Sequence, residues 1–68
     1  MKVINTIKQT RKQKRITQEE LAQAVQVSRQ TIVAIENGKY NPSLELSLKL
    51  VAFFNCSFDE IFYLENKE

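Results

Sequence analysis

The chain has 68 residues, of which 43% are hydrophobic, and its formal net charge is +2. From this length we expect one small domain and no separate ligand-binding domain. The longest apolar run, residues 50–54, is far too short to span a membrane, and the amino terminus has no apolar signal-peptide core. The single cysteine, Cys56, cannot form a disulfide within the chain, so we expect a cytoplasmic protein with no membrane association.

The charge is distributed unevenly along the chain. Residues 1–15 contain six lysine and arginine side chains and no acidic one, whereas residues 41–68 contain two lysines and five acidic residues. A basic segment and an acidic segment indicate a polarised surface with one part directed at a polyanion. An ordinary solvated helix face is the alternative. We favour the polyanion because the basic segment adjoins two closely spaced helices predicted within residues 17–37.

A short strand and a helix are expected at the amino terminus. The segment 2–4 is partly β-branched, which favours an edge strand. Asn5 is a suitable N-cap for a first helix over residues 6–14. Ile7 and Arg11 lie four residues apart and are therefore predicted on the inward side of this helix.

A second helix is predicted over residues 18–25. Thr17 stands at its N-cap position, and Glu20 three residues later completes a capping box. Ile16 before the cap and Leu21 after it can close a hydrophobic staple. These local signals define where the helix begins.

The same pattern recurs at the start of a third helix, which is expected over residues 29–36. Ser28 is its N-cap, and Val27 and Ile32 form a second staple around it. Three residues remain for the connection between the two helices. A helix, a three-residue turn and another helix make the helix-turn-helix layout over 17–37, which leaves the first turn of the third helix free to enter a DNA groove.

Two further helices complete the chain. Gly38 follows the third helix, and glycine is the usual residue for the left-handed position that ends a helix. Ser43 is the predicted cap of a fourth helix that ends near Phe54. Ser57 and Glu60 form another capping box, which indicates a short fifth helix.

The chain ends are candidates for pairing. The segment 62–64 alternates weakly and can pair with residues 3–4 as a two-stranded antiparallel ribbon. Isolated ribbons of this size are marginal, so unpaired ends are the alternative. We therefore expect residues 1–68 to form one mostly all-α domain of five helices, with or without a ribbon that joins its ends.

The fourth helix carries more apolar surface than one face needs. Leu44, Leu48 and Val51 form one stripe. The second stripe consists of Leu46, Leu50, Phe53 and Phe54. One stripe belongs to the core, and we expect the other to form a two-fold homodimer surface within residues 44–64, because cyclic dimers dominate soluble oligomers. The alternative is a small fold that wraps around the whole helix. The expected interface residues are Leu46, Leu50, Phe53, Phe58, Phe62 and Tyr63.

Three strings of residues, in this order, resemble the motifs of the Cro/C1-type (Xre) family of helix-turn-helix repressors. They are Gln18-x-x-Leu21-Ala22, Val27-Ser28-Arg29-x-x-Ile32-x-x-Ile35-Glu36-Asn37-Gly38 and Pro42-Ser43. The resemblance covers roughly residues 4–61. Within the family, the chain is similar to small single-domain repressors of Gram-positive bacteria, in which the chain ends pair as a small sheet. The resemblance implies a lambda-repressor-like domain that binds double-stranded DNA, at a palindromic operator, as a homodimer.

The resemblance also implies which residues contact bases. It places residues 28–36 in the major groove, where each base pair shows a distinguishable donor and acceptor pattern. Arg29 and Gln30 are then the main candidates, because arginine can fork onto guanine and glutamine onto adenine. The alternative for both is ordinary solvated helix surface. The secondary candidates are Ser28, Thr31 and Ala34.

Other residues are expected to contact the DNA backbone. Gln18 opens the second helix, where free backbone N–H groups attract a phosphate, and the family glutamine also braces the recognition helix. The remaining candidates are Asn37, Lys39, Tyr40, Asn41 and Ser43. Such contacts position the protein without reading sequence, and they make binding dependent on salt.

Two further residues have structural expectations. Glu36 ends a helix, where a carboxylate opposes the macrodipole, and the family pattern implies a partly buried, bidentate ion pair with Arg11. Gln26 stands in the turn where the family commonly has glycine. If Gln26 is left-handed, the conformation costs about 1 kcal/mol.

An enzyme is not expected. The chain has no histidine and no Gly-rich phosphate loop, and it shows no cluster of metal ligands, so we predict no cofactor and no metal. The adjacent carboxylates Asp59 and Glu60 point apart on a helix and make a poor catalytic pair. The main alternative to a self-sufficient repressor is an antitoxin-like module that binds a regulatory protein partner and retains DNA binding for autoregulation.

Overall fold

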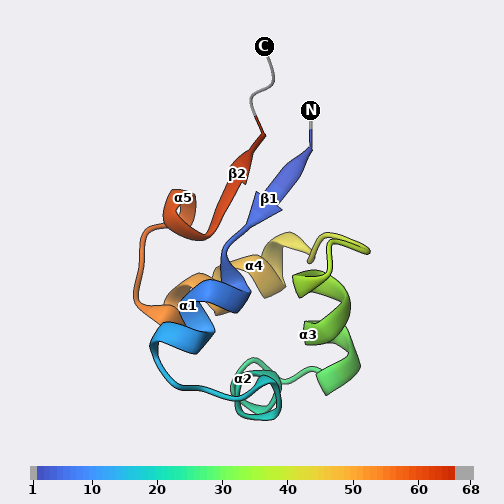
Figure 1. The fold of residues 1–68 in the computed structure, drawn as a ribbon, viewed down its shortest axis with the longest axis vertical. Helices are drawn as coiled ribbons and strands as arrows, with labels where there is room; N and C mark the ends of the chain where they lie inside the picture. The colour runs from blue at the N-terminus through green and yellow to red at the C-terminus, as the bar shows by residue number, and fades with distance from the viewer. Residues whose placement is uncertain (1, 66–68) are drawn as a thin grey trace.

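The computed structural model describes residues 2–65 and contains five helices and two short strands (Figure 1). In chain order they are β1 (Val3–Asn5), α1 (Ile7–Gln13), α2 (Gln18–Ala24), α3 (Arg29–Glu36), α4 (Leu44–Phe54), α5 (Phe58–Ile61) and β2 (Phe62–Leu64). The expected mostly α-helical class is confirmed. Met1 and residues 66–68, which the expected domain includes, lie outside the described residues. Between residues 2 and 65, none of the helices has the length and apolar character that crossing a membrane requires.

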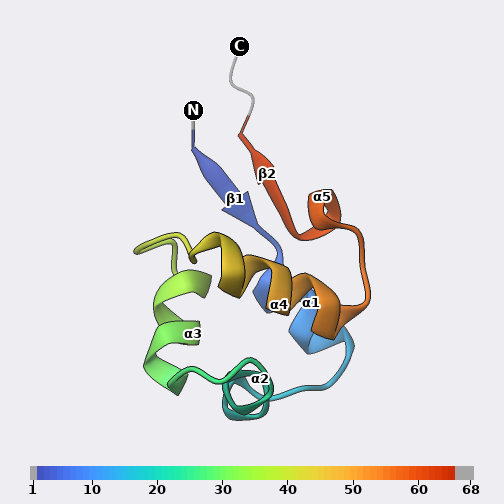
Figure 2. The ribbon, with the colours of Figure 1, turned by 180° about the vertical axis from the view of Figure 1, so that it is seen from behind.

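The two chain ends pair as an antiparallel ribbon that projects from the helices (Figures 1 and 2). The paired residues are Val3 with Leu64, Ile4 with Tyr63, and Asn5 with Phe62. The ribbon is attached to the helical body, because the Thr6 amide donates to the Ile61 carbonyl at 2.9 Å and Phe62 is buried. This attachment supplies the support that an isolated ribbon lacks.

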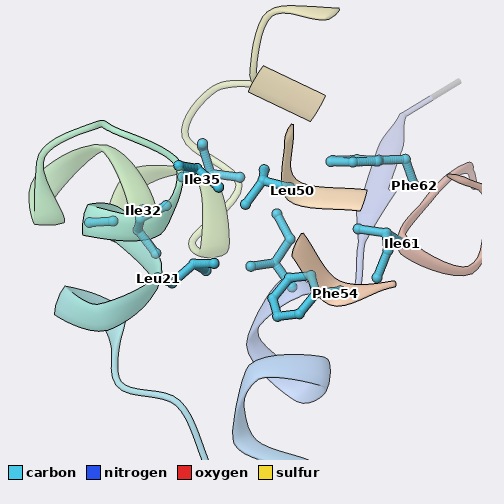
Figure 3. Packing of buried hydrophobic residues seen from close by; sticks show 10 residues of the cluster. Leu21, Ile32, Ile35, Leu50, Phe54, Ile61 and Phe62 are labelled. Carbon is cyan, nitrogen blue, oxygen red and sulfur yellow. The ribbon is translucent and has the colours of Figure 1, made fainter. Parts of the chain in front are cut away.

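The core lies where the helices and the carboxy-terminal segment meet (Figure 3). Its labelled side chains are Leu21, Ile32, Ile35, Leu50, Phe54, Ile61 and Phe62. Burying a side chain of this size contributes about 1.5–3 kcal/mol. Because both helices of the helix-turn-helix contribute to this cluster, the same burial that holds the domain together also fixes α2 against α3.

Capping boxes begin two of the helices, as the sequence predicts. The Thr17 hydroxyl accepts from the Glu20 amide at 3.0 Å, and the Glu20 carboxylate accepts from the Thr17 amide at 2.8 Å. In α5 the Ser57 amide donates to the Glu60 carboxylate at 2.8 Å. Hydrogen bonds from the Ser57 amide and hydroxyl lower the pKa of the Glu60 carboxyl, because they stabilise its charged form.

The start of α1 differs from the expectation. Asn5 lies in β1, and Thr6 occupies the N-cap position without capping through its side chain. The reason is that the Thr6 hydroxyl donates instead to the Glu60 carbonyl at 2.8 Å. The Asn5 side chain reaches over from the strand, and its Oδ1 accepts from the Ile7 amide at 3.1 Å. Asn5 therefore caps the helix as predicted, but it does so from β1, one residue before the N-cap position.

The expected partner surface on α4 requires a correction. Leu50 is fully buried and Phe62 is 7% exposed, so neither belongs to an interface, and Leu46 is half-buried against the core. The side of α4 that carries Leu50 faces the core, and the outward stripe is instead formed by Leu44 and Leu48, which are 70% and 53% exposed. The other expected interface residues, Phe53, Phe58 and Tyr63, are exposed.

The first three helices end in the same way. The second residue after each helix has a left-handed backbone conformation, with φ values of 60° at Arg15, 65° at Gln26 and 73° at Gly38. The next residue then donates its amide back to the last turn of the helix. These bonds run from Ile16 to Arg11, from Val27 to Ala22 and from Lys39 to Ala34, at 3.1, 2.9 and 2.9 Å. They are Schellman motifs, and two of them use a residue other than glycine.

Gln26→Gly is expected to stabilise the protein. A non-glycine residue in the left-handed region costs roughly 1 kcal/mol, so glycine should raise the free energy of unfolding by about 0.5–1 kcal/mol after its own entropy cost. Urea denaturation followed by circular dichroism measures this change. The matched control is Gln23→Gly inside α2, which should lower the free energy of unfolding by about 1 kcal/mol. A loss of stability in both variants would show that the turn is not strained.

Candidate nucleic-acid interface

The helix-turn-helix is held by a turn that fits between two caps. After α2, the Gln26 amide donates to the Gln23 carbonyl at 3.2 Å and the Val27 amide to the Ala22 carbonyl at 2.9 Å. Ser28 then caps α3 directly, because its hydroxyl accepts from the backbone amide three residues on at 3.2 Å. Gln26 and Val27 end α2 and Ser28 begins α3, so hydrogen bonds at both ends of the turn set the direction in which α3 leaves it.

The main base-contacting candidates lie together at the start of α3. Arg29 and Gln30 are exposed, and neither side chain forms a hydrogen bond or ion pair with another residue between 2 and 65. Among the secondary candidates, Ser28 is exposed, while Thr31 and Ala34 are half-buried. The Ser28 and Thr31 hydroxyls form a hydrogen bond with each other at 3.0 Å. The first turn of α3 therefore presents one unpaired cation and one unpaired amide to solvent.

The other side of α3 is fixed by an ion pair between Arg11 and Glu36. Arg11 Nε donates to Glu36 Oε2 at 2.8 Å, and Nη2 donates to Oε1 at 3.2 Å. The side chains are only 10% and 2% exposed. Arg11 Nη1 donates in addition to the Ile16 carbonyl at 2.9 Å. The bidentate geometry makes this a strong and directional contact between α1 and α3.

Gln18 joins the same network from α2. Its Nε2 donates to Glu36 Oε1 at 3.0 Å, so the carboxylate receives hydrogen bonds from two helices. The side chain of Gln18 is thereby committed to bracing α3. The two residues that follow it in the first turn, Glu19 and Glu20, are acidic and exposed. A phosphate at this helix start would meet the positive end of the helix dipole but also two carboxylates.

The candidates for backbone contacts surround the loop between α3 and α4. Asn37, Lys39, Tyr40, Asn41 and Ser43 are all exposed. Lys39 has no carboxylate within ion-pair distance among residues 2–65. The Ser43 hydroxyl caps α4 by accepting from the Leu46 amide at 3.1 Å. The loop thus offers polar side chains beside the exposed start of a helix, an arrangement suited to phosphate oxygens.

A groove of about 340 Å³ opens between the ribbon and the start of α4. Its lining residues are Val3, Asn41, Pro42, Ser47, Phe58, Phe62, Tyr63 and Leu64. None of the base-contacting candidates lines it. The described residues contain no group of three or more histidine, cysteine, aspartate or glutamate side chains arranged to hold a metal ion. The groove is therefore a mainly apolar feature of the ribbon side of the molecule.

One hydrogen bond to α3 was not predicted from the sequence. The Asn5 Nδ2 donates to the Ile35 carbonyl at 3.1 Å, across 30 positions of the chain. The sequence singled out Asn5 as a helix cap but gave no sign of this second partner. No local pattern contains such a signal, because the contact depends on where the ribbon lies against α3.

Comparisons with known proteins agree with this geometry. The family model described as "Helix-turn-helix" matches residues 7–61. The chain is 48% identical over 64 residues to an uncharacterized HTH-type transcriptional regulator of Methanocaldococcus jannaschii, covering 94% of this chain and 97% of the relative. It is 41% identical over 63 residues to the uncharacterized HTH-type transcriptional regulator YgzD of Bacillus subtilis, covering 93% and 96%. The crystal structure of a candidate DNA-binding protein from Bacteroides fragilis matches with a TM-score of 0.82 at 26% identity, covering 90% of this chain and 98% of that chain.

Glu36→Ala is expected to lower the free energy of unfolding by about 3–5 kcal/mol, because it leaves the buried Arg11 charge without its partner. Thermal and urea denaturation followed by circular dichroism measure the loss. The matched control is Glu19→Ala, an exposed carboxylate in the same motif, which should change stability by less than about 0.5 kcal/mol. A folded Glu36→Ala variant with unchanged stability would overturn the structural role of this pair.

Proposed function

Because the chain belongs to the Cro/C1-type (Xre) family of helix-turn-helix transcriptional regulators, we propose that it is a repressor that binds a palindromic operator as a homodimer. In this proposal α3 enters the major groove. The observation that carries it is the exposed pair Arg29 and Gln30 on a helix whose opposite side is fixed to the core and to two other helices. A DNA-reading helix needs both properties, since base contacts require free side chains on a rigid support.

The dimensions of α3 suit direct readout. Its eight residues give a length of roughly 12 Å at 1.5 Å per residue, and a helix with its side chains is about 10–12 Å in diameter. The major groove of B-DNA is about 12 Å wide and admits one helix. In this position Arg29 would fork onto the O6 and N7 of a guanine, and Gln30 would pair with the N6 and N7 of an adenine. Ser28, Thr31 and Ala34 would add contacts along the same edge, the last to a thymine methyl group.

Backbone contacts would fix the register of the helix in the groove. We assign them to the loop between α3 and α4, whose side chains Asn37, Lys39, Tyr40, Asn41 and Ser43 are exposed. The amino terminus of α2, with Gln18, would face a second phosphate. Such contacts add affinity at every sequence and weaken as salt rises. They therefore support the base readers without determining the operator.

A homodimer is favoured by the apolar surface on α4, the ribbon side and the chain between them. The exposed large apolar side chains there are Leu44, Leu48, Phe53, Phe58, Tyr63 and Leu64. Phe58, Tyr63 and Leu64 line the same groove, and exposed apolar side chains that lie together mark interaction sites. A two-fold dimer formed through this surface would carry two copies of α3, and an operator with two-fold symmetry would match them. The alternative occupant of the same surface is a regulatory protein partner.

Selection of binding sites from random duplex DNA near physiological salt tests the proposal. We expect enrichment of a palindrome whose half-sites lie about one helical turn apart. The Arg29→Ala, Gln30→Ala variant should lose or relax this preference, because each bidentate base pairing contributes about 1–3 kcal/mol of discrimination. The matched control is Gln9→Ala, Gln13→Ala on the exposed side of α1, which should select the same site. Retention that depends on salt but not on sequence would contradict a self-sufficient repressor.

The dimer is tested by Leu48→Glu. A carboxylate at this exposed apolar position should convert the protein to monomers in sedimentation equilibrium and weaken binding to the palindrome while single half-sites are still bound. Gln23→Glu on α2 is the control, because it adds the same charge at an exposed position that is not one of these apolar residues. A wild-type protein that stays monomeric, and gains stability only when another protein is added, would favour the partner-dependent alternative.

A further inference from the structure

The side chain of Asn5 joins the chain-end ribbon to the recognition helix. Its Nδ2 donates to the Ile35 carbonyl at 3.1 Å, while its Oδ1 accepts from the Ile7 amide at 3.1 Å. Both ends of the carboxamide are therefore used, one toward α1 and one toward α3. Within residues 2–65, this is the only hydrogen bond between the ribbon and α3.

The acceptor lies at a structurally sensitive point. The Ile35 carbonyl belongs to the last turn of α3, where backbone carbonyls have no partner within the helix. It also accepts from the Gly38 amide at 3.0 Å, as part of the Schellman motif that ends this helix. The Ile35 side chain has no exposed surface. Asn5 therefore holds a carbonyl that is buried beside the core, at the end of α3 opposite to the base-contacting residues.

The ion-pair network holds the carboxy-terminal end of α3 from the side of α1 and α2 only. Arg11 and Gln18 hold the Glu36 side chain against α1 and α2, but neither contact reaches the ribbon. With α3 about 12 Å long, a shift of about 2 Å at its carboxy-terminal end tilts the helix axis by roughly 10°. A tilt of that size redirects the base-contacting side chains, and a bidentate base contact tolerates little displacement, since hydrogen-bond distances vary over only about 0.5 Å.

We propose that Asn5 is a positioning residue for operator recognition, which sets the tilt of α3 by tying its carboxy-terminal end to the ribbon. This inference rests on the proposed function, in which α3 reads bases. The ribbon lies beside the apolar groove and carries the exposed Tyr63. Through the hydrogen bond from Asn5, a change in the position of the ribbon would alter the position of the base-contacting residues on α3.

The test compares two adjacent substitutions. Asn5→Asp keeps an acceptor for the Ile7 amide but removes the donor to the Ile35 carbonyl. The matched control is Thr6→Ala, which removes a hydroxyl that donates to the Glu60 carbonyl at 2.8 Å and lies 3.4 Å from the Thr10 hydroxyl, and neither contact involves α3. Asn5→Ser is the second test variant, because its short hydroxyl is neutral and does not span the distance to α3.

The first readout is the ratio of two affinities, measured by fluorescence anisotropy at a temperature where every variant is folded by circular dichroism. One duplex carries the selected operator, and the other carries the same bases scrambled. A smaller folded fraction or an added charge changes both affinities together, whereas a tilted α3 lowers their ratio. We expect the ratio to fall by roughly two- to tenfold in both Asn5 variants, the effect of one neutral hydrogen bond, and to be unchanged in Thr6→Ala.

The second readout is amide hydrogen exchange without DNA. The Gly38 and Lys39 amides, which close the end of α3, should exchange roughly two- to tenfold faster in the Asn5 variants than in Thr6→Ala. Unchanged exchange at these amides, or an affinity ratio equal to that of the wild type, overturns the role of Asn5. If the wild-type protein selects no operator, the proposed function fails, and the exchange rates still decide whether Asn5 holds the end of the helix.

Discussion

The buried ion pair between Arg11 and Glu36 is the contact on which the arrangement of the first three helices depends. Taking two charges out of water is costly, and the structure offsets this cost by giving Glu36 three hydrogen bonds and by joining Arg11 to a backbone carbonyl as well. Apolar side chains can slide and repack at similar energy, but a bidentate pair with a third donor from Gln18 has one geometry. The hydrophobic core brings α1, α2 and α3 together, and the ion pair selects how they are rotated. In the proposed function, recognition depends on that selection, because the free side of α3 is defined by the side that is held.

The turns between the first three helices are short because one residue in each turn both ends a helix and packs against the core. Ile16 and Val27 close the preceding helix by donating to its last turn, and both are half-buried against the core as the following helix begins. The connection from α2 to α3 is therefore short enough to transmit the direction of one helix to the other. Each of the first three helices ends with a residue in the left-handed conformation, which is unfavourable for residues other than glycine. After α2 this residue is Gln26. Hydrogen bonds on both sides of Gln26 stabilise the turn enough to hold this conformation.

The parts of the fold that follow from neighbouring residues could be predicted from the sequence. Contacts between distant residues could not be derived from it, and the pairing of the chain ends was one of two alternatives. Thr17 and Ser28 mark helix starts because their partners lie three residues away. The pairing of Arg11 with Glu36 required the family resemblance, since nothing local connects them. Helical periodicity found two apolar stripes on α4, yet it could not decide whether the side with Leu50 or the side with Leu48 faces inward. The contact of Asn5 with α3 was beyond the sequence for the same reason, and the roles of the base-contacting candidates remain predictions.

The ribbon has a consequence for the order in which the chain acquires its structure. Pairing Val3 with Leu64 closes a loop that contains almost all of the described residues, whereas the contacts between α2 and α3 are local. Loop closure of this length costs chain entropy before any pairing stabilises it, so local helical contacts form early and the ribbon closes late. During synthesis the helix-turn-helix leaves the ribosome before β2 does. A nascent chain therefore has α3 assembled against α2 first and gains the contact from Asn5 to α3 only when the two strands meet.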